Sequence, residues 1–148
     1  MEPENGFIQE FKVKGGDFSK AGSISTEIKE ILQEVGIDSS IIRRVAIASY
    51  EAEMNMVMYS RKGEVSFILD SVKILIKTSD EGPGIEDIDK AMQEGFSTAT
   101  DEMREMGFGA GMGLPNIKKH SDEFKITSEI GKGTNLSITF YLEQQNKQ

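Results

Sequence analysis

The chain has 148 residues, 37% of them hydrophobic, which is enough for a single domain with one sizeable core. It contains no cysteine, which excludes disulfide frameworks and thiolate metal sites, and its formal net charge of −8 argues against nucleic-acid binding, which needs basic side chains to replace phosphate counterions. No apolar run reaches the roughly 18 residues of a membrane span, and residues 1–5 are unlike a secretory signal, so we expect a cytoplasmic protein that does not bind membranes.

The first half of the chain predicts one strand and two helices. Residues 6–14 alternate loosely between apolar and polar side chains and predict a first strand. An apolar stripe at helical spacing follows, with Asp17 or Ser19 as the candidate N-cap. A second helix begins after Asp38 or Ser39 as its cap. Its core-facing positions repeat at a spacing of three to four residues: Ile41, Val45, Ala48, Ala52, Met56 and Tyr59.

Two strands and a long irregular stretch come next. Residues 64–69 and 72–79 predict strands around a short turn, and the alternation of apolar and polar residues in the second is typical of a half-buried strand. The stretch 80–111 is weakly patterned, with at most a short helix at 85–94. Loops of this length inside compact domains are usually functional lids or disordered segments.

The last part of the chain predicts one helix and a strand pair. The helix at 112–120 opens directly out of glycines, and 123–129 and 135–142 form strands joined by a glycine-containing turn. The strands connect as hairpins and the helices gather together in the sequence. This order predicts an α+β fold, a two-layer sandwich.

A carboxylate and a carboxamide lie close together on the second helix. Glu51 and Asn55 are four residues apart and therefore share one helix face. The carboxylate can orient and deprotonate a hydroxyl group, and the amide oxygen can ligate Mg²⁺, a cation that prefers oxygen. Glutamate is common on exposed helix faces, so this pair in isolation is better explained as solvated surface.

An acidic residue followed by glycines comes directly after the predicted strand 72–79. Asp80 at a strand end can accept a hydrogen bond from an exocyclic amine such as that of adenine, and Gly82 and Gly84 let the backbone run close to a flat base. A plain turn built from Asp, Gly and Pro explains this segment equally well on its own.

Four alternating glycines, at positions 107, 109, 111 and 113, lead into the predicted helix 112–120 and its first turn. Glycines let backbone N–H groups approach phosphates, and a helix N-terminus favours negative charge. A Rossmann pyrophosphate loop is the competing interpretation, but it should follow a strand, and the preceding residues 98–106 are polar. A flexible linker is the other alternative, and the apolar helix that follows argues against it.

In this order and spacing, the three segments 51–55, 80–85 and 107–114 resemble the N box and the two glycine boxes of the GHKL (Bergerat) ATP-binding superfamily. The likeness is strongest to the bacterial anti-sigma-factor and switch serine/threonine kinases, through residues 109–124 and 126–134. It implies that residues 1–148 form a single GHKL kinase domain of the Bergerat type, with a mixed, mostly antiparallel sheet, helices on one face and a lid at about 95–113.

The resemblance also implies a role for each matching position. Glu51 matches the catalytic base, Asn55 the Mg²⁺ ligand and Asp80 the residue that reads adenine. The other positions that match the pocket for ATP or ADP are Gly82, Gly84, Ile85, Gly109, Gly111, Met112, Gly113, Leu114 and Thr134. Two departures concern Tyr59, where many relatives place His, and an acidic, Met-containing insert at 100–106.

The implied function is transfer of the γ-phosphoryl group of ATP to a Ser or Thr of a STAS-domain anti-anti-sigma or antagonist protein. By the same resemblance, a sigma factor or another regulator is a second partner, and a homodimer is expected by analogy. The alternative from a different class is a non-catalytic, nucleotide-dependent clamp that sequesters a partner; Glu51 argues against it, because a pure binder needs no base. A third alternative is a pseudo-enzyme whose insert blocks the lid. The sequence leaves open whether the chain is an anti-sigma factor or an upstream switch kinase.

Overall fold

A computed structural model describes residues 6–93 and 113–142 of the chain. In chain order its elements are β1 (Phe7–Lys14), the short 3-10 helix η1 (Phe18–Lys20), α1 (Ser23–Glu34), α2 (Ser39–Tyr59), β2 (Lys62–Leu69), β3 (Lys73–Glu81), α3 (Ile88–Ala91), α5 (Gly113–His120), β4 (Glu123–Glu129) and β5 (Gly133–Tyr141). Each element that the sequence predicts is present, with ends that differ by a few residues.

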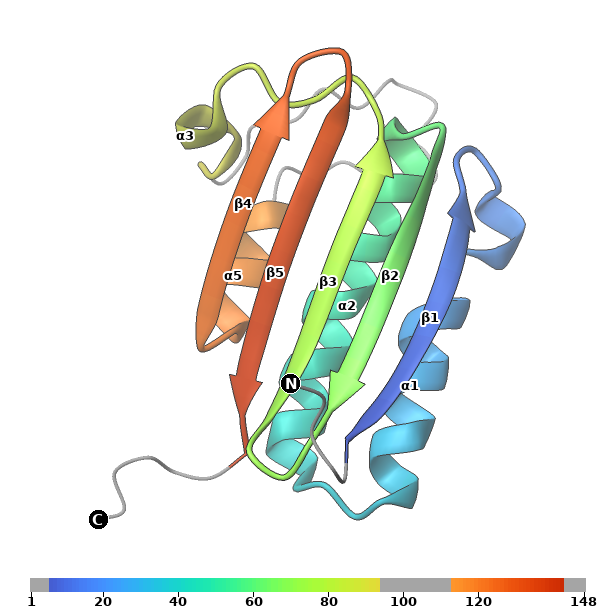
Figure 1. The fold of residues 1–148 in the computed structure, drawn as a ribbon, viewed down its shortest axis with the longest axis vertical. Coiled ribbons are helices and arrows are strands. Elements are labelled where there is room, and N and C mark those ends of the chain that lie inside the picture. Colours follow the sequence, from blue (N-terminus) through green and yellow to red (C-terminus); the bar gives the residue numbers. More distant parts are fainter. Residues whose placement is uncertain (1–5, 94–112, 143–148) are drawn as a thin grey trace.

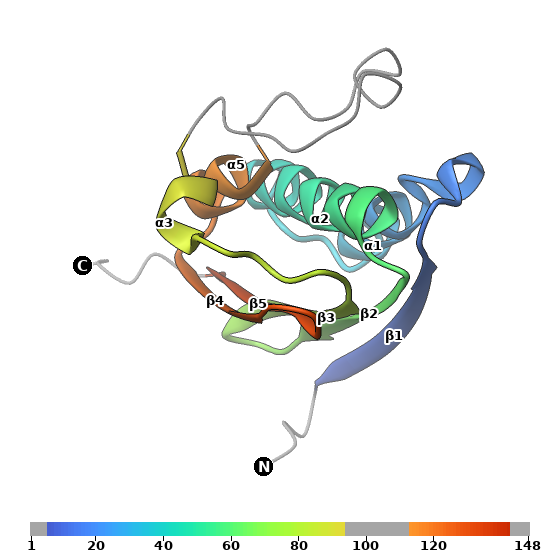
Figure 2. The same ribbon diagram turned by 90° about the horizontal axis from the view of Figure 1, so that it is seen from above.

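The strands form one five-stranded sheet in the order β1-β2-β3-β5-β4 (Figure 1). Each of the four strand pairings in the described residues is antiparallel, where the sequence predicted a mixed, mostly antiparallel sheet. Seen from above, α1, α2 and α5 lie together over one face of the sheet (Figure 2). The α+β two-layer sandwich is therefore confirmed.

The core lies between the helix layer and the sheet. Side chains of β2 and β3 alternate between buried and exposed positions, as expected for strands with one covered face. Phe67, Ile76 and Phe140 from the sheet are fully buried, and each such side chain stabilises the fold by about 1.5–3 kcal/mol. The predicted core stripe of α2 is buried except for Tyr59, which is half-buried at the end of the helix.

The two long helices begin in different ways. Asp38 is the N-cap of α2, as the sequence predicted, and its carboxylate accepts a hydrogen bond from the backbone N–H of Ser40 at 3.0 Å. The predicted cap of α1 is wrong. Ser19 donates a hydrogen bond to the side chain of Asp17 instead, and α1 begins only at Ser23, after Gly22 with a φ of 94°.

The carboxylate of Glu53, on α2, occupies the place of the missing cap. It accepts hydrogen bonds from the backbone N–H groups of Gly22, Ile24 and Ser25 at 2.9, 3.3 and 3.1 Å. The first N–H groups of a helix lack partners within the helix, and the positive end of the helix dipole attracts an anion. Glu53 is only 3% exposed, so it joins α1 to α2 from inside the protein.

Candidate functional site

Glu51 and Asn55 lie on the side of α2 that meets the first turn of α5. A Cβ atom placed on Gly113 would lie 3.1 Å from Asn55 Oδ1 and 3.5 Å from Glu51 Oε1, so the start of α5 lies close to the pair, and a side chain at position 113 would have to displace the Asn55 amide slightly. Asn116, one turn further along α5, donates a hydrogen bond from Nδ2 to Glu51 Oε2 at 3.3 Å. A carboxylate, a carboxamide and a helix N-terminus therefore meet at one place.

The other end of α5 is held against α2 by Arg44. Its Nε donates to the carbonyl oxygen of His120 at 2.9 Å, and its Nη2 forms an ion pair with Asp122 Oδ1 at 2.9 Å. The guanidinium carbon also lies 5.8 Å from the centroid of the Phe140 ring. Because Arg44 precedes Glu51 on α2 while His120 follows Asn116 on α5, the two helices run antiparallel.

Asp80 lies half-buried near the end of β3. Its Oδ1 accepts a hydrogen bond from the backbone N–H of Thr134 at 3.1 Å. Burial raises the pKa of Asp80 above its usual value of 3.8, while hydrogen bonds from Thr134, Ser60 and Gly82 act in the opposite direction. The ionised form is thus disfavoured by desolvation and supported by donors from three separate segments.

Glycines make room for the backbone around Asp80. Gly133 has a φ of 141°, and a Cβ atom there would lie 1.9 Å from the carbonyl oxygen of Asp80. A Cβ atom on Gly82 would lie 3.1 Å from both Asp80 Oδ1 and Ser60 Oγ. Larger residues at these two positions would displace the carboxylate or the backbone beside it.

The loop after β3 is joined to the β4–β5 hairpin. Gly84 has a φ of 80°, and a Cβ atom there would lie 2.4 Å from the carbonyl oxygen of Glu129. The backbone N–H of Ile85 donates to Ser128 Oγ at 2.7 Å, and Ser128 Oγ lies 2.9 Å from Thr134 Oγ1. The structure therefore brings Gly82, Gly84, Ile85 and Thr134 together around Asp80.

Sequence reasoning missed Ser60, Ser128 and Asn116. Ser128 and Thr134 face each other in the β4–β5 register, so two opposed hydroxyl groups in a hairpin were the available signal for Ser128. For Ser60 and Asn116 the sequence offers no local signal, because their contacts join distant segments.

The Glu51–Asn55 pair and the Asp80 cluster lie along the same half of α2. Ser60, which hydrogen-bonds to Asp80, follows Asn55 by five residues, about 7.5 Å along a helix axis. Met56, next to Asn55, also approaches this cluster, because a Cβ atom on Gly63 would lie 2.5 Å from Met56 Sδ and 3.3 Å from Asp80 Cβ. The two groups of residues are therefore neighbours, about one and a half helical turns apart along α2.

The remaining predicted site residues are distributed between described and undescribed parts of the chain. Leu114 is half-buried and packs against the core beside Gly113. Gly109, Gly111 and Met112 lie outside the described residues, as does most of the predicted lid. Within 6–93 and 113–142, no group of three or more His, Cys, Asp or Glu side chains could hold a metal ion, so the Mg²⁺ prediction rests on Asn55. A single protein ligand is compatible with Mg²⁺, which takes most of its ligands from water and substrate phosphates.

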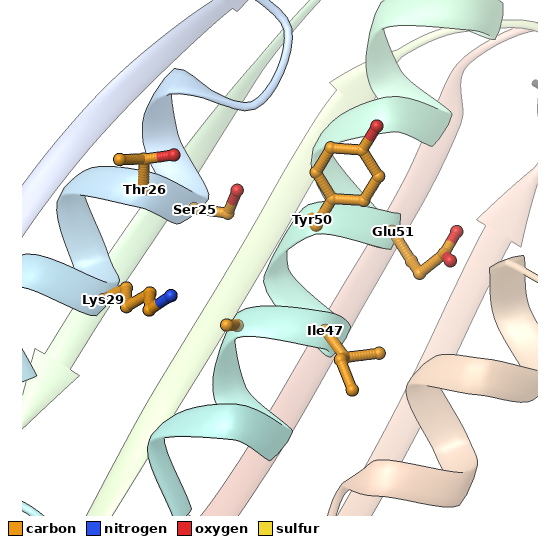
Figure 3. Close-up of a pocket in the computed structure, with 7 residues that line it drawn as sticks. Ser25, Thr26, Lys29, Ile47, Tyr50 and Glu51 are labelled. Carbon is orange, nitrogen blue, oxygen red and sulfur yellow. The ribbon is translucent and has the colours of Figure 1, made fainter. Parts of the chain in front are cut away.

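A groove of about 340 Å³ lies on the other side of α2, between α1 and α2. Ser25, Thr26 and Lys29 of α1 line it opposite Tyr50 and Ile47 of α2 (Figure 3). The carboxylate of Glu51 extends away from α1, toward α5 (Figure 3). Glu51 also lines this groove, but its carboxylate meets Asn116 and Gly113 on the α5 side of the helix.

Comparison with known proteins gives a consistent result. Residues 37–146 match the family model described as histidine kinase-, DNA gyrase B- and HSP90-like ATPase. The chain is 33% identical to the serine/threonine-protein kinase RsbT of Bacillus subtilis (strain 168), over 77% of this chain and 83% of the relative. It is 35% identical to an anti-sigma F factor of Caldanaerobacter subterraneus, over 82% and 78% of the two chains. The fold also resembles the crystal structure of the SiaB–SiaC complex from Pseudomonas aeruginosa, with a TM-score of 0.62, 15% identity and coverage of 89% and 88%.

Proposed function

Because this chain belongs to the family of histidine kinase-, DNA gyrase B- and HSP90-like ATPases, we propose that its candidate site transfers the γ-phosphoryl group of ATP to a Ser or Thr of a STAS-domain antagonist protein. The chain is a nucleotide-binding serine/threonine protein kinase of the anti-sigma and switch type, and it works with a protein partner. The observation that carries the proposal is the meeting of Glu51, Asn55 and Gly113 at the N-terminus of α5.

Glu51 is the proposed base. Phosphoryl transfer depends more on positioning and charge neutralisation than on covalent chemistry by the protein. The acceptor oxygen loses its proton to the Glu51 carboxylate and bonds to the γ-phosphorus, while ADP leaves with the electron pair of the broken bond. Because Glu51 lies beside the start of α5, it is close to the end of the helix that attracts phosphate.

Asn55 and Gly113 are the proposed phosphate-end groups. The Asn55 amide oxygen is a suitable ligand for Mg²⁺, which supplies positive charge to the phosphates when it is bound with ATP. Gly113 leaves the space directly above Asn55 free of a side chain. Gly109, Gly111 and Met112 are proposed to extend the phosphate contacts, as the family resemblance implies.

Asp80 is the proposed adenine reader. Its carboxylate is held by donors from Thr134, Ser60 and Gly82 and remains half-buried, which suits recognition of an exocyclic amine. Gly82, Gly84, Ile85 and Thr134 shape the surface around it. A site that hydrogen-bonds a ligand amine discriminates strongly against analogues that lack the amine, because the buried acceptor is then unpaired.

Two measurements test the proposal. Calorimetric titration of ATP and ADP, with and without Mg²⁺, is expected to show Mg²⁺-dependent binding that Asp80→Asn abolishes and Glu51→Gln retains. Transfer from γ-labelled ATP to a panel of purified STAS-domain proteins from the same genome is expected for the wild type, and in Glu51→Gln it should be slower by about 10²–10⁴-fold but still measurable. Glu34→Gln, an exposed carboxylate at the end of α1, is the matched control.

The results separate the kinase from its alternatives. A nucleotide clamp would bind ATP in both the wild type and Glu51→Gln but label no protein in either. A pseudo-enzyme would bind no nucleotide at all. The cytoplasmic location and the homodimer stay predictions, and the choice between anti-sigma factor and switch kinase stays open. Among the described residues, no helix is long and apolar enough to cross a membrane.

A further inference from the structure

We infer that Asn116 is a positioning residue for Glu51: its side-chain amide holds one carboxylate oxygen of the base and thereby orients the other. This inference rests on the proposed function. The motif comparison assigns no role to Asn116, and the residue enters only through the structure, where its Nδ2 lies 3.3 Å from Glu51 Oε2.

The contact divides the two oxygens of Glu51 between different surroundings. Oε2 receives the amide hydrogen of Asn116, while Oε1 lies nearest to Gly113, where the absence of a side chain leaves space. Asn116 and Gly113 are three residues apart and share one face of α5. The same helix face therefore restrains one oxygen and leaves the other open toward the proposed phosphate end.

The helix that carries Asn116 is itself held firmly. The His120 ring Nδ1 lies 2.8 Å from the carbonyl oxygen of Asn116, and Arg44 binds the carbonyl oxygen of His120. Ile117, next to Asn116, is fully buried in the core. Because α5 is fixed in place, the Asn116 amide can hold the Glu51 side chain in one rotamer where it would otherwise sample several.

The chemistry of an amide suits this role. A lysine or arginine at position 116 would orient Glu51 but add a full positive charge beside a group that must accept a proton. An aspartate would place two carboxylates together. The neutral amide donates one hydrogen bond with defined direction and adds no net charge, so it orients the base without forming an ion pair with it.

The test is a double-mutant cycle on phosphoryl transfer to the STAS-domain protein that the wild type labels best. We expect Asn116→Ala to lower kcat by about tenfold, because small displacements of a catalytic group are costly, and to leave the calorimetric Kd for ATP unchanged. Asn116→Gln should recover part of the loss. In the Glu51→Gln background, Asn116→Ala should cause no further loss. Lys119→Ala, exposed on the same helix, is the control.

A loss that is equally large in both backgrounds would overturn the inference, since Asn116 would then act on the fold and not through Glu51. An unchanged kcat in Asn116→Ala would overturn it while leaving the kinase intact. If the wild type transfers no phosphate, the proposed function fails and a second measurement decides. The Asn116 side-chain amide resonances, identified by their loss in Asn116→Ala, should shift in Glu51→Ala but not in Glu34→Ala. Resonances that do not move in Glu51→Ala would rule out the contact.

Discussion

Replacement of Glu53 should destabilise the protein far more than replacement of any exposed glutamate. Its carboxylate accepts three backbone hydrogen bonds at the start of α1 and is 3% exposed. Glu53→Ala leaves these N–H groups without an acceptor, and an unsatisfied buried donor costs about 1–3 kcal/mol. Gly22 is only half-buried, so water can accept a hydrogen bond from its N–H group in the variant and offset part of the loss. We therefore expect a loss of about 3–5 kcal/mol of unfolding free energy.

Glu53→Gln is the informative partner variant. Its amide oxygen can still accept the bonds that Gly22 and Ile24 make to one carboxylate oxygen, but its NH₂ group would face the N–H of Ser25. One bond is lost, so the expected cost is about 1–3 kcal/mol. The free energy of unfolding of a domain is typically about 5–15 kcal/mol. Even if Glu53→Ala removes most of it, Glu53→Gln should remain folded, so its unfolding can be measured.

Urea unfolding followed by circular dichroism measures these differences. The midpoint should fall in the order wild type, Glu53→Gln, Glu53→Ala at an unchanged m-value. Glu34→Ala, on the exposed end of α1, should stay within about 0.5 kcal/mol of the wild type. A loss below about 1 kcal/mol for Glu53→Ala would refute the reasoning, because it would mean that α1 does not depend on the internal carboxylate.

Three further outcomes follow from the site geometry. Gly113→Ala should change the unfolding free energy by no more than about 1 kcal/mol from the wild type, since alanine favours helices. It should raise the Kd for ATP by about tenfold, because its Cβ approaches Asn55 Oδ1 at 3.1 Å. An unchanged Kd by calorimetry would contradict this expectation. Arg44→Ala should lower the free energy of unfolding, measured in urea, by about 1–3 kcal/mol, and Arg44→Lys should recover part of the loss. If Arg44→Lys is as stable as the wild type, the simultaneous contacts of Arg44 with His120 and Asp122 do not contribute to stability. The pKa of Asp80 is raised in the folded protein, so folding favours the protonated form. The free energy of unfolding of the wild type, relative to that of Asp80→Asn, should therefore be greatest below pH 3.8 and fall as the pH rises through the raised pKa. Unfolding experiments that find no change in this difference across the range would refute the direction of the pKa shift.

The sequence by itself predicted most of the local structure. The strands, the two long helices, the helix after the glycines and the cap of α2 at Asp38 are encoded by neighbouring residues, through side-chain periodicity and the hydrogen bond from the backbone N–H of Ser40. The resemblance of the three motif segments to a known superfamily also implied the family and most of the residues that meet around Glu51 and Asp80, but it missed Ser60, Ser128 and Asn116. The roles of Gly109, Gly111 and Met112 stay predictions, since these residues lie outside the described part of the chain.

Only the tertiary structure decided which distant residues complete the local elements. The cap of α1 comes from Glu53, about thirty residues away along the chain, and not from Asp17 or Ser19 as the sequence predicted. The hydrogen bond from Asn116 to Glu51 spans 65 residues, and the strand order places β5 between β3 and β4. No local pattern encodes these choices, because a buried carboxylate or amide finds its partners only after the helices and the sheet have packed together, when unsatisfied polar groups become costly.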